Sequence, residues 1–153
     1  MKRLVLLIQD KIPSDILGKY GTLILSLSHF EWILQEFIIL LVLKTNFDKL
    51  NNTHVILADH ISKLNFDRKI KTIEKFKLMT KSLTEKINKI RKKRVTFVHG
   101  TVLQTSDSSL IIKLISRPDQ EDFTINNITN FLNDLEDTGN QLLNEFENQG
   151  FTL

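Results

Sequence analysis

Residues 83–100 read LTEKINKIRKKRVTFVHG, and this stretch decides the fold that we expect for the chain. Four apolar residues and one arginine recur in it at steps of four, three, four and four, which places them on one face of a helix: Leu83, Ile87, Ile90, Arg94 and Val98. Glycine is common just after the last turn of a helix. The stretch therefore predicts an amphipathic helix that Gly100 ends.

Helical patterns continue on both sides of this stretch. Pro13-Ser14-Asp15 is a helix-start signal, in which the serine or the aspartate is able to cap. The pattern that follows, over about 15–44, is apolar almost all round, which predicts a central helix or one that a second subunit partly buries. We expect further helices over 54–64, from Asn65 to Met79, and over 124–146.

The period changes after Gly100. Residues 101–105 and 110–116 are short and β-branched, and Ser106-Asp107-Ser108-Ser109 separates them, which predicts a hairpin. Thr124 is a candidate cap for the last helix. We expect an all-α fold: a bundle of about four or five helices with a small β-hairpin inserted before the last helix. No linker is evident, so residues 1–153 are interpreted as a single domain.

Composition limits the classes of function. The chain has 153 residues, 41% of them apolar, and no cysteine, which suits a globular protein without disulfide or thiolate chemistry. The apolar run that begins at Leu4 stops at Gln9 without a cleavage site, so we expect no signal peptide. Residues 23–43 include His29 and Glu36, which favours a buried helix over a membrane span. We therefore expect a cytoplasmic protein.

Charge is unevenly distributed. From Lys63 to Arg94 there are 13 Lys and Arg residues against three acids, whereas from Val95 onward nine acids face only Lys113 and Arg117. A basic block of this kind favours an anionic partner, and simple solvation of exposed helices is the alternative interpretation.

Several familiar sites are not indicated by the sequence. There is no glycine-rich phosphate loop, and the four histidines lack the spacing of a metal site, so we expect no metal and no cofactor. Arg94 and His99 are the residues that suggest chemistry. Arg94 occupies a core-facing position where a guanidinium needs an anion, and His99 at a helix end can exchange a proton near neutral pH.

At this point the chain resembles a known family, the HEPN domains (higher eukaryotes and prokaryotes nucleotide-binding). The similarity lies in Arg94-x-x-x-x-His99-Gly100, in residues 29–34 within the long first helix, and in the Leu64-x-Phe66-x-x-Lys69-Ile70 restart. It extends as a pattern from about Ile16 to Phe146. The resemblance implies an all-α bundle that is usually dimeric, and in many members a metal-independent ribonuclease of toxin–antitoxin or phage-defence systems. It implies that Arg94 and His99 are the catalytic pair.

The implied reaction needs no metal. A histidine can deprotonate the 2′-hydroxyl of RNA or protonate the departing 5′-oxygen, and an arginine can neutralise charge on the phosphoryl oxygens. Residues five apart in a helix point about 140° away from each other. We therefore expect a homodimer that brings two sets of Arg94 and His99 to one cleft.

Other residues are expected to support this site. Lysines on the same helix would attract the RNA backbone: Lys86, Lys89, Lys92 and Lys93. Glu31 is a supporting candidate that would pair with Arg94 and orient it. An antitoxin or another regulatory protein is an expected partner.

Three hypotheses remain open from the sequence. The first is the HEPN-type ribonuclease. The second is a non-catalytic HEPN-like module that binds RNA or protein, which the apolar Val95 favours because the family often has a polar residue at that position. The third is a structural dimerisation protein whose basic face meets an acidic partner or a neighbouring acidic segment.

Overall fold

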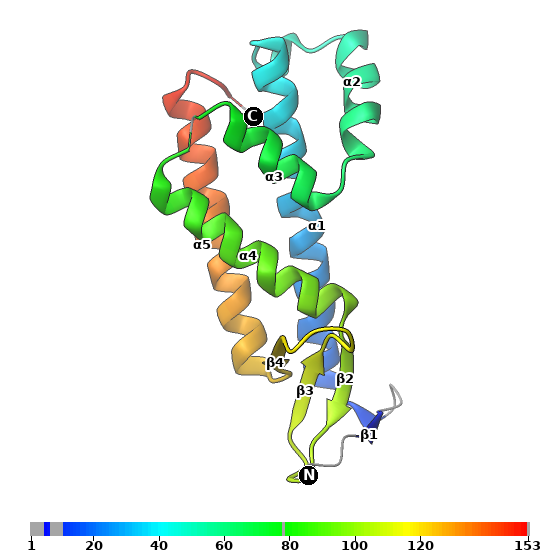
Figure 1. Ribbon diagram of the computed structural model, residues 1–153. Coiled ribbons are helices and arrows are strands. Elements are labelled where there is room, and N and C mark those ends of the chain that lie inside the picture. Colours follow the sequence, from blue (N-terminus) through cyan, green and yellow to red (C-terminus); the bar gives the residue numbers. More distant parts are fainter. Residues whose placement is uncertain (1–4, 7–10, 78, 153) are drawn as a thin grey trace. The chain divides into compact units, whose positions relative to one another are not determined.

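In the part of the chain that the structure describes, five α-helices and a small antiparallel sheet before the last helix are present, so the expected fold class is confirmed (Figure 1). The computed structural model describes residues 5–6, 11–77 and 79–152. The α-helices are α1 (Ser14–Leu43), α2 (Asn52–Ser62), α3 (Phe66–Lys75), α4 (Lys81–His99) and α5 (Ile125–Asn148), with a short 3-10 helix, η2 (Phe47–Lys49), between α1 and α2.

Side-chain oxygens cap the starts of four helices. The Asn51 side chain accepts a hydrogen bond from the Thr53 backbone N–H at 2.9 Å, and this bond begins α2. The Asn65 side chain caps α3 by accepting a hydrogen bond from the Arg68 N–H at 2.9 Å. Thr80 Oγ1 and Thr124 Oγ1 each lie 3.2 Å from a backbone N–H three residues later, at the starts of α4 and α5. These bonds satisfy amide groups that the helix leaves without a partner.

Some helix ends differ from the prediction. The Leu17 N–H bonds to the Pro13 carbonyl, so Ser14 and Asp15 lie inside the first turn of α1 and neither is its cap. α3 ends at Lys75 and not at Met79, because Lys77 adopts a left-handed backbone with φ of 53°. Apolar residues beyond Lys75 suggested a longer helix, but Phe76 is 40% exposed and does not continue the buried stripe.

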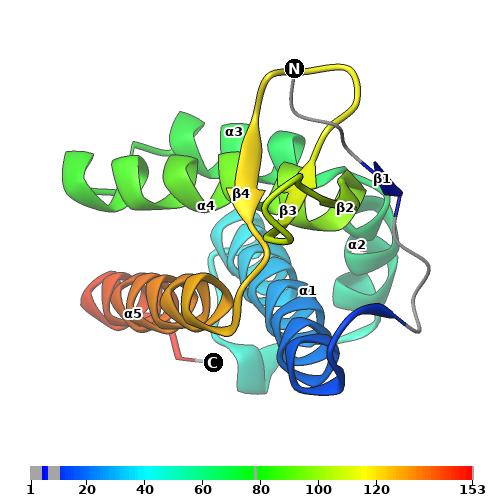
Figure 2. The same cartoon turned by 90° about the horizontal axis from the view of Figure 1, so that it is seen from below.

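The predicted hairpin is the central part of a four-stranded antiparallel sheet with the order β1-β2-β3-β4 (Figures 1 and 2). β2 (Thr101–Gln104) and β3 (Leu110–Lys113) form the hairpin, with Thr101 opposite Lys113. The two outer strands, β1 (Val5–Leu6) and β4 (Gln120–Asp122), were not predicted from the sequence. The residues of β4 are polar or acidic, types that are depleted in strands, so propensity gave no signal there.

The signal-peptide expectation concerned the first ten residues. Apart from β1, these residues lie outside the described part of the chain.

The chain divides into two compact units, and α1, α4 and α5 each contribute residues to both. The first unit comprises residues 1–27 and 89–134 and includes the sheet. Its core contains Phe97 and Phe131, whose ring centroids lie 5.4 Å apart. Tyr20 packs edge-on against Phe123 in the same core, with centroids 5.3 Å apart.

The second unit comprises residues 28–88 and 135–153. Buried side chains from all five helices form its core, where Phe37 contacts Phe146 and Phe30 contacts Phe66. Two buried charged side chains also lie in this unit: Glu36, whose carboxylate lies beside the His54 imidazole, and Lys69, which pairs with Glu31.

The buried face of α4 differs from the expected one at its end. Leu83, Ile87 and Ile90 are buried as predicted, but the fully buried residue that follows is Phe97, whereas Val98 is only partly buried. Phe97 lies three residues after Arg94 and Val98 lies four. A step of three here follows the helical repeat of about 3.6 residues more closely than a second consecutive step of four. Thr96 is buried beside Phe97.

α1 is the one helix in the described part of the chain that is long and apolar enough to cross a membrane. Of its most apolar window, 56% is buried inside the protein, and Leu23, Leu34 and Phe37 in α1 have no exposed surface. These properties are compatible with the predicted role as a core helix of a soluble protein.

The junction between α4 and β2 generates a first prediction. Gly100 directly follows the last residue of α4, as predicted, and it has no positive φ. The requirement for glycine is steric, because a Cβ atom at this position would overlap the Thr96 carbonyl oxygen and lie 2.7 Å from Ile112 Cγ1. We expect Gly100→Ala to lower the free energy of unfolding by about 1–3 kcal/mol, as overpacking does. Urea denaturation measures this change.

Gly18→Ala is the matched control for this substitution. No atom lies within 4 Å of a Cβ at Gly18, which is exposed within α1. Alanine there should increase stability by about 0.5–1 kcal/mol. Equal effects of the two substitutions would contradict a steric requirement at Gly100.

The turn between β2 and β3 generates a second prediction. Asp107 accepts hydrogen bonds from the Thr105 hydroxyl, the Ser109 hydroxyl and the Ser109 N–H, and these lower its pKa from 3.8 to about 2. A depressed folded pKa means that the carboxylate stabilises the turn above about pH 4, and that this contribution is lost as the pH falls through about 2. NMR titration should show the pKa of Asp107 rising toward 3.8 in Thr105→Val and remaining unchanged in Ser106→Ala.

Candidate functional site

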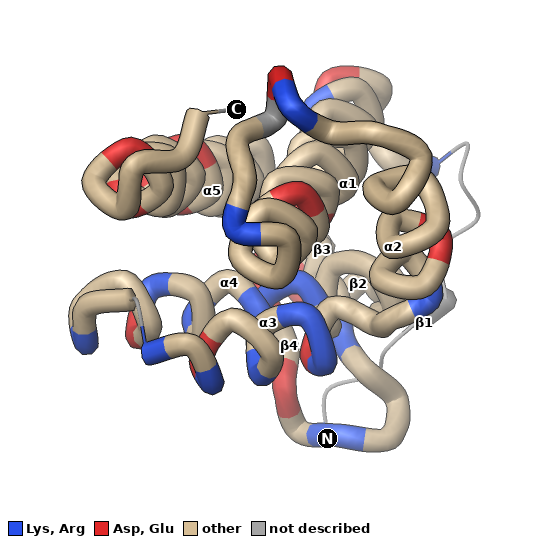
Figure 3. Tube along the Cα trace, turned by 90° about the horizontal axis from the view of Figure 1, so that it is seen from above, with Lys and Arg blue, Asp and Glu red and all other residues tan. Residues whose placement is uncertain are grey.

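α4 carries most of the charge that suggested a nucleic-acid partner. Its sequence has seven Lys or Arg residues and one acid, whereas α5 has acids and no Lys or Arg. Figure 3 shows the resulting blue segments on α4 and red segments on α5. The helix is regular from Lys81 to His99, so Arg94 and His99 belong to the same uninterrupted element.

Arg94 and His99 lie in different environments. Arg94 is partly buried and engages in an interaction within the chain. His99 is the last residue of α4 and is exposed. In a regular helix their side chains leave the axis about 140° apart. The two groups therefore do not share one face of α4 within a single chain, as the sequence analysis anticipated.

The end of α4 is held in place by two hydrogen bonds. The Tyr20 hydroxyl of α1 donates to the Phe97 carbonyl at 2.6 Å, and the Gly100 N–H bonds to the Thr96 carbonyl at 2.8 Å. Helix ends leave carbonyl groups without partners, and these bonds satisfy two of them. Burial raises the pKa of Tyr20, so its hydroxyl keeps the proton that it donates. His99 is thus exposed at a helix end whose backbone is fixed.

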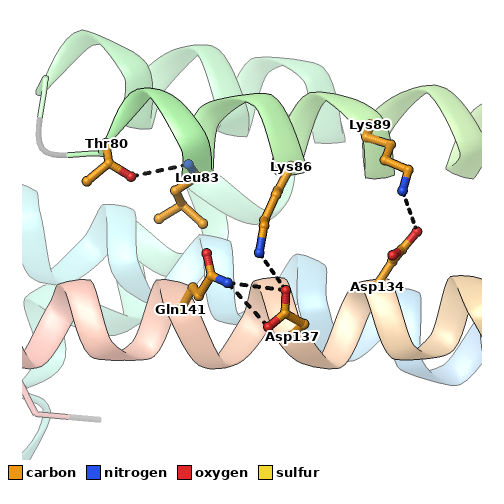
Figure 4. Close-up of polar contacts among 7 residues, drawn as sticks. All are labelled: Thr80, Leu83, Lys86, Lys89, Asp134, Asp137 and Gln141. Atoms are coloured by element: carbon orange, nitrogen blue, oxygen red, sulfur yellow. Dashed lines mark hydrogen bonds and ion pairs between the residues drawn. The ribbon is translucent and has the colours of Figure 1, made fainter.

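Two of the predicted RNA-binding lysines form ion pairs with α5 (Figure 4). Lys86 Nζ lies 2.6 Å from Asp137 Oδ2, and Lys89 Nζ lies 3.0 Å from Asp134 Oδ2. The hydrogen bond from Lys86 lowers the pKa of Asp137. The basic helix therefore does meet an acidic segment of the same chain.

The remaining two lysines differ from each other. Lys93 Nζ lies 5.4 Å from the centroid of the Phe131 ring, a cation–π contact that also involves α5. Lys92 is exposed and precedes His99 by seven residues, which returns to nearly the same side of a helix. Lys92 is therefore the predicted lysine that shares a face with His99, and the RNA contacts of all four lysines stay a prediction.

Glu31 has a partner on α3. Its Oε1 accepts a hydrogen bond from Lys69 Nζ at 3.0 Å, and the Lys69 side chain is only 4% exposed. A cation buried to this degree needs its carboxylate, because an unpaired charge inside a protein is costly. Glu31 thus has a structural role, and its predicted pairing with Arg94 stays a prediction.

The sequence analysis did not anticipate a second carboxylate of α1 that contacts a neighbouring helix. Glu36 is 4% exposed, and its Oε2 lies 3.2 Å from His54 Nε2 at the start of α2. An isolated glutamate in an apolar run was the only signal in the sequence, and it did not identify the partner.

Within the described residues, no group of three or more His, Asp or Glu side chains is arranged to hold a metal ion.

The ion pairs with α5 generate a third prediction. If Lys86 and Lys89 contact RNA, the double substitution Asp134→Asn/Asp137→Asn removes competing carboxylates and should increase the affinity for single-stranded RNA severalfold. Each additional phosphate contact steepens the logarithmic salt dependence of binding by about 0.7. Fluorescence anisotropy titrations at several salt concentrations measure both quantities.

A control with the same change in net charge is Glu136→Gln/Glu147→Gln. Both glutamates are exposed on α5, and neither forms an ion pair with a residue that the structure describes. If the two double variants bind RNA alike, the gain reflects net charge alone, and Lys86 and Lys89 do not contact RNA.

Comparison of the chain with known protein families, with curated proteins and with solved structures gives no match. The functional assignment therefore rests on the chemistry of the residues at the end of α4.

Proposed function

We propose that this protein is a metal-independent endoribonuclease of HEPN type, in which Arg94 and His99 form the catalytic pair. The observation that supports this proposal best is the exposed position of His99 at the fixed C-terminal end of α4, five residues after Arg94. Free access to the imidazole is necessary for a base that acts on a polymer.

The reaction that we propose balances without a cofactor. One His99 removes the proton of a 2′-hydroxyl, the 2′-oxygen bonds to the adjacent phosphorus, and the bond from phosphorus to the 5′-oxygen breaks. The 5′-oxygen takes a proton from the imidazolium that His99 has become, or from water. The products are a 2′,3′-cyclic phosphate and a free 5′-hydroxyl, and Arg94 neutralises the charge on the phosphoryl oxygens.

A homodimer is part of the proposal. Because Arg94 and His99 diverge by about 140° around α4, one chain does not direct both at the same phosphate. Two-fold pairing would place Arg94 of one protomer beside His99 of the other. A ribonuclease of this kind must be kept inactive until it is needed, so we also propose a regulatory partner such as an antitoxin. We further propose a phage-defence setting and a cytoplasmic location.

A non-catalytic RNA- or protein-binding module is the second candidate. Two observations favour it: Val95 follows Arg94 where the family often has a polar residue, and Lys86 and Lys89 are engaged with α5. The same ion pairs are also what the structural hypothesis expects of a basic face that meets a neighbouring acidic segment.

Incubation of the protein with mixed RNA in EDTA tests the proposed function. Wild type should release fragments that end in a 2′,3′-cyclic phosphate, and His99→Ala should be slower by about 10²–10⁴-fold because a general acid or base contributes that much. His60→Ala is the control, since His60 is an exposed histidine on α2. Circular dichroism verifies that each variant is folded. RNA that is bound but left intact by wild type would support the binding module instead.

Mixing two inactive variants tests the shared site. In a dimer of Arg94→Ala with His99→Ala, one of the two Arg94/His99 pairs keeps both wild-type groups if each pair takes its residues from different protomers. Activity should therefore reappear on mixing and subunit exchange. If the mixture stays inactive while the heterodimer is shown to form, the two groups of each pair come from the same chain.

A further inference from the structure

Two basic residues stand apart in the last part of the sequence. From Val95 onward the chain has nine acids and only two cations, Lys113 and Arg117. Neither was considered for the site from sequence, because they lie 14 and 18 residues beyond His99 on a predicted hairpin and turn. The fold brings both to the end of the sheet that adjoins α4.

The strand register places Lys113 close to His99. β2 begins at Thr101, one residue after Gly100, and Thr101 pairs with Lys113 of β3. Directly opposed residues in an antiparallel pair have Cα atoms about 4.5–5.5 Å apart. The chain leaves the end of α4 in β2 and returns toward it in β3 (Figure 1). Lys113 therefore lies one strand spacing from Thr101, which follows His99 by two residues.

The same register defines the face of the sheet on which Lys113 lies. Ile112 points toward Gly100, because a Cβ on that glycine would contact its side chain. Successive residues of a strand point to opposite faces, so Lys113 lies on the other face. Its partners on the two neighbouring strands are uncharged, Thr101 on β2 and Gln120 on β4.

Arg117 lies in the tight turn that follows β3. Its N–H bonds to the Leu114 carbonyl at 3.3 Å, and the Leu114 N–H bonds to the Asp119 carbonyl at 3.4 Å. These bonds keep Arg117 at the same end of the sheet as Lys113. The Arg117 and Asp119 side chains are both exposed.

The ion pairing of these two cations differs from that of Lys86 and Lys89 on α4. Lys86 and Lys89 have carboxylate partners on α5. Among the described residues, neither Lys113 nor Arg117 forms an ion pair, and Lys92 forms none on the face of α4 that it shares with His99. Cations without a carboxylate partner are the ones that bind phosphate without first losing an interaction.

We infer that Lys113 and Arg117, together with Lys92, bind the phosphates that flank the reacting one on a single-stranded RNA. This inference rests on the proposed function, since it takes His99 as the reacting group. Lys92 lies about 10 Å before His99 along the helix axis, at 1.5 Å per residue, and the sheet end provides cations beyond it. An RNA backbone that passes His99 then meets positive charge on both sides. Single strands are favoured because an unpaired backbone can follow such a path.

Binding of an oligonucleotide that cannot react tests this surface independently of cleavage. The probe is a single-stranded oligoribonucleotide with 2′-O-methyl groups, which lacks the attacking hydroxyl. Lys113→Gln/Arg117→Gln should weaken its binding at least tenfold and lower the logarithmic salt slope by about 1.4, the value for two lost phosphate contacts. Lys113→Arg should retain wild-type affinity, because it keeps the charge.

The control with the same loss of charge is Lys71→Gln/Lys75→Gln, at two exposed lysines of α3. It should weaken binding much less. Equal effects of the two double variants, or wild-type affinity of Lys113→Gln/Arg117→Gln, would overturn the inference. Thermal unfolding of each variant shows that the fold is intact.

The outcomes separate this inference from the proposed function. If wild type does not cleave RNA but Lys113→Gln/Arg117→Gln still binds the probe more weakly than wild type, the nuclease proposal fails and the binding surface stands. If His99→Ala abolishes cleavage and the double variant binds normally, the surface alone is refuted. Tighter binding of a polyglutamate peptide than of the oligonucleotide would refute RNA as the ligand and indicate an acidic protein.

Discussion

The close approach of backbone and side chain at Gly100 is the constraint on which the candidate site depends. A Cβ atom at this position would overlap the Thr96 carbonyl and crowd Ile112, so glycine lets the chain turn from α4 into β2 without displacing either group. The turn ends α4 at His99 and begins the sheet two residues later. It also leaves the Phe97 carbonyl available to the Tyr20 hydroxyl. An exposed histidine at a rigid helix end, beside one end of a sheet, is the consequence.

Local signals in the sequence predicted the parts of the fold that are decided locally. Thr124 was identified as a helix cap because a cap needs only a side-chain oxygen and an amide a few residues later. The hairpin was recognisable because its signal is local too: two short β-branched stretches separated by a polar turn. β4 was not, since its polar residues form a strand only because β3 provides a pairing edge. Val98 was predicted to be buried in place of Phe97 because a step of four from Arg94 reaches Val98 and a step of three reaches Phe97. Both steps lead to positions near the buried face of the helix.

The candidate site could be predicted only in part, because a run of lysines carries no information about partners. Lys86 and Lys92 look equivalent in the sequence, yet one pairs with Asp137 and the other is exposed on the face of His99. Exposed ion pairs are individually weak, so a polyanion can compete for the paired lysines. The unpaired cations have no such competition. Lys113 and Arg117 are remote from His99 in the sequence, and only the strand register brings them near it.

The two carboxylates of α1 show how a functional interpretation and a structural one are distinguished. Glu31 was a site candidate because it interrupts an apolar helix, but Glu36 interrupts the same helix, and both carboxylates have partners on other helices. A buried ion pair contributes little net stability, whereas removing one partner leaves a costly unpaired charge. The pairs with Lys69 and His54 therefore specify which helices pack against α1. The exposed His99 and the cations Lys113 and Arg117 form no ion pair within the described part of the chain, so binding of an external phosphate would cost them no internal partner.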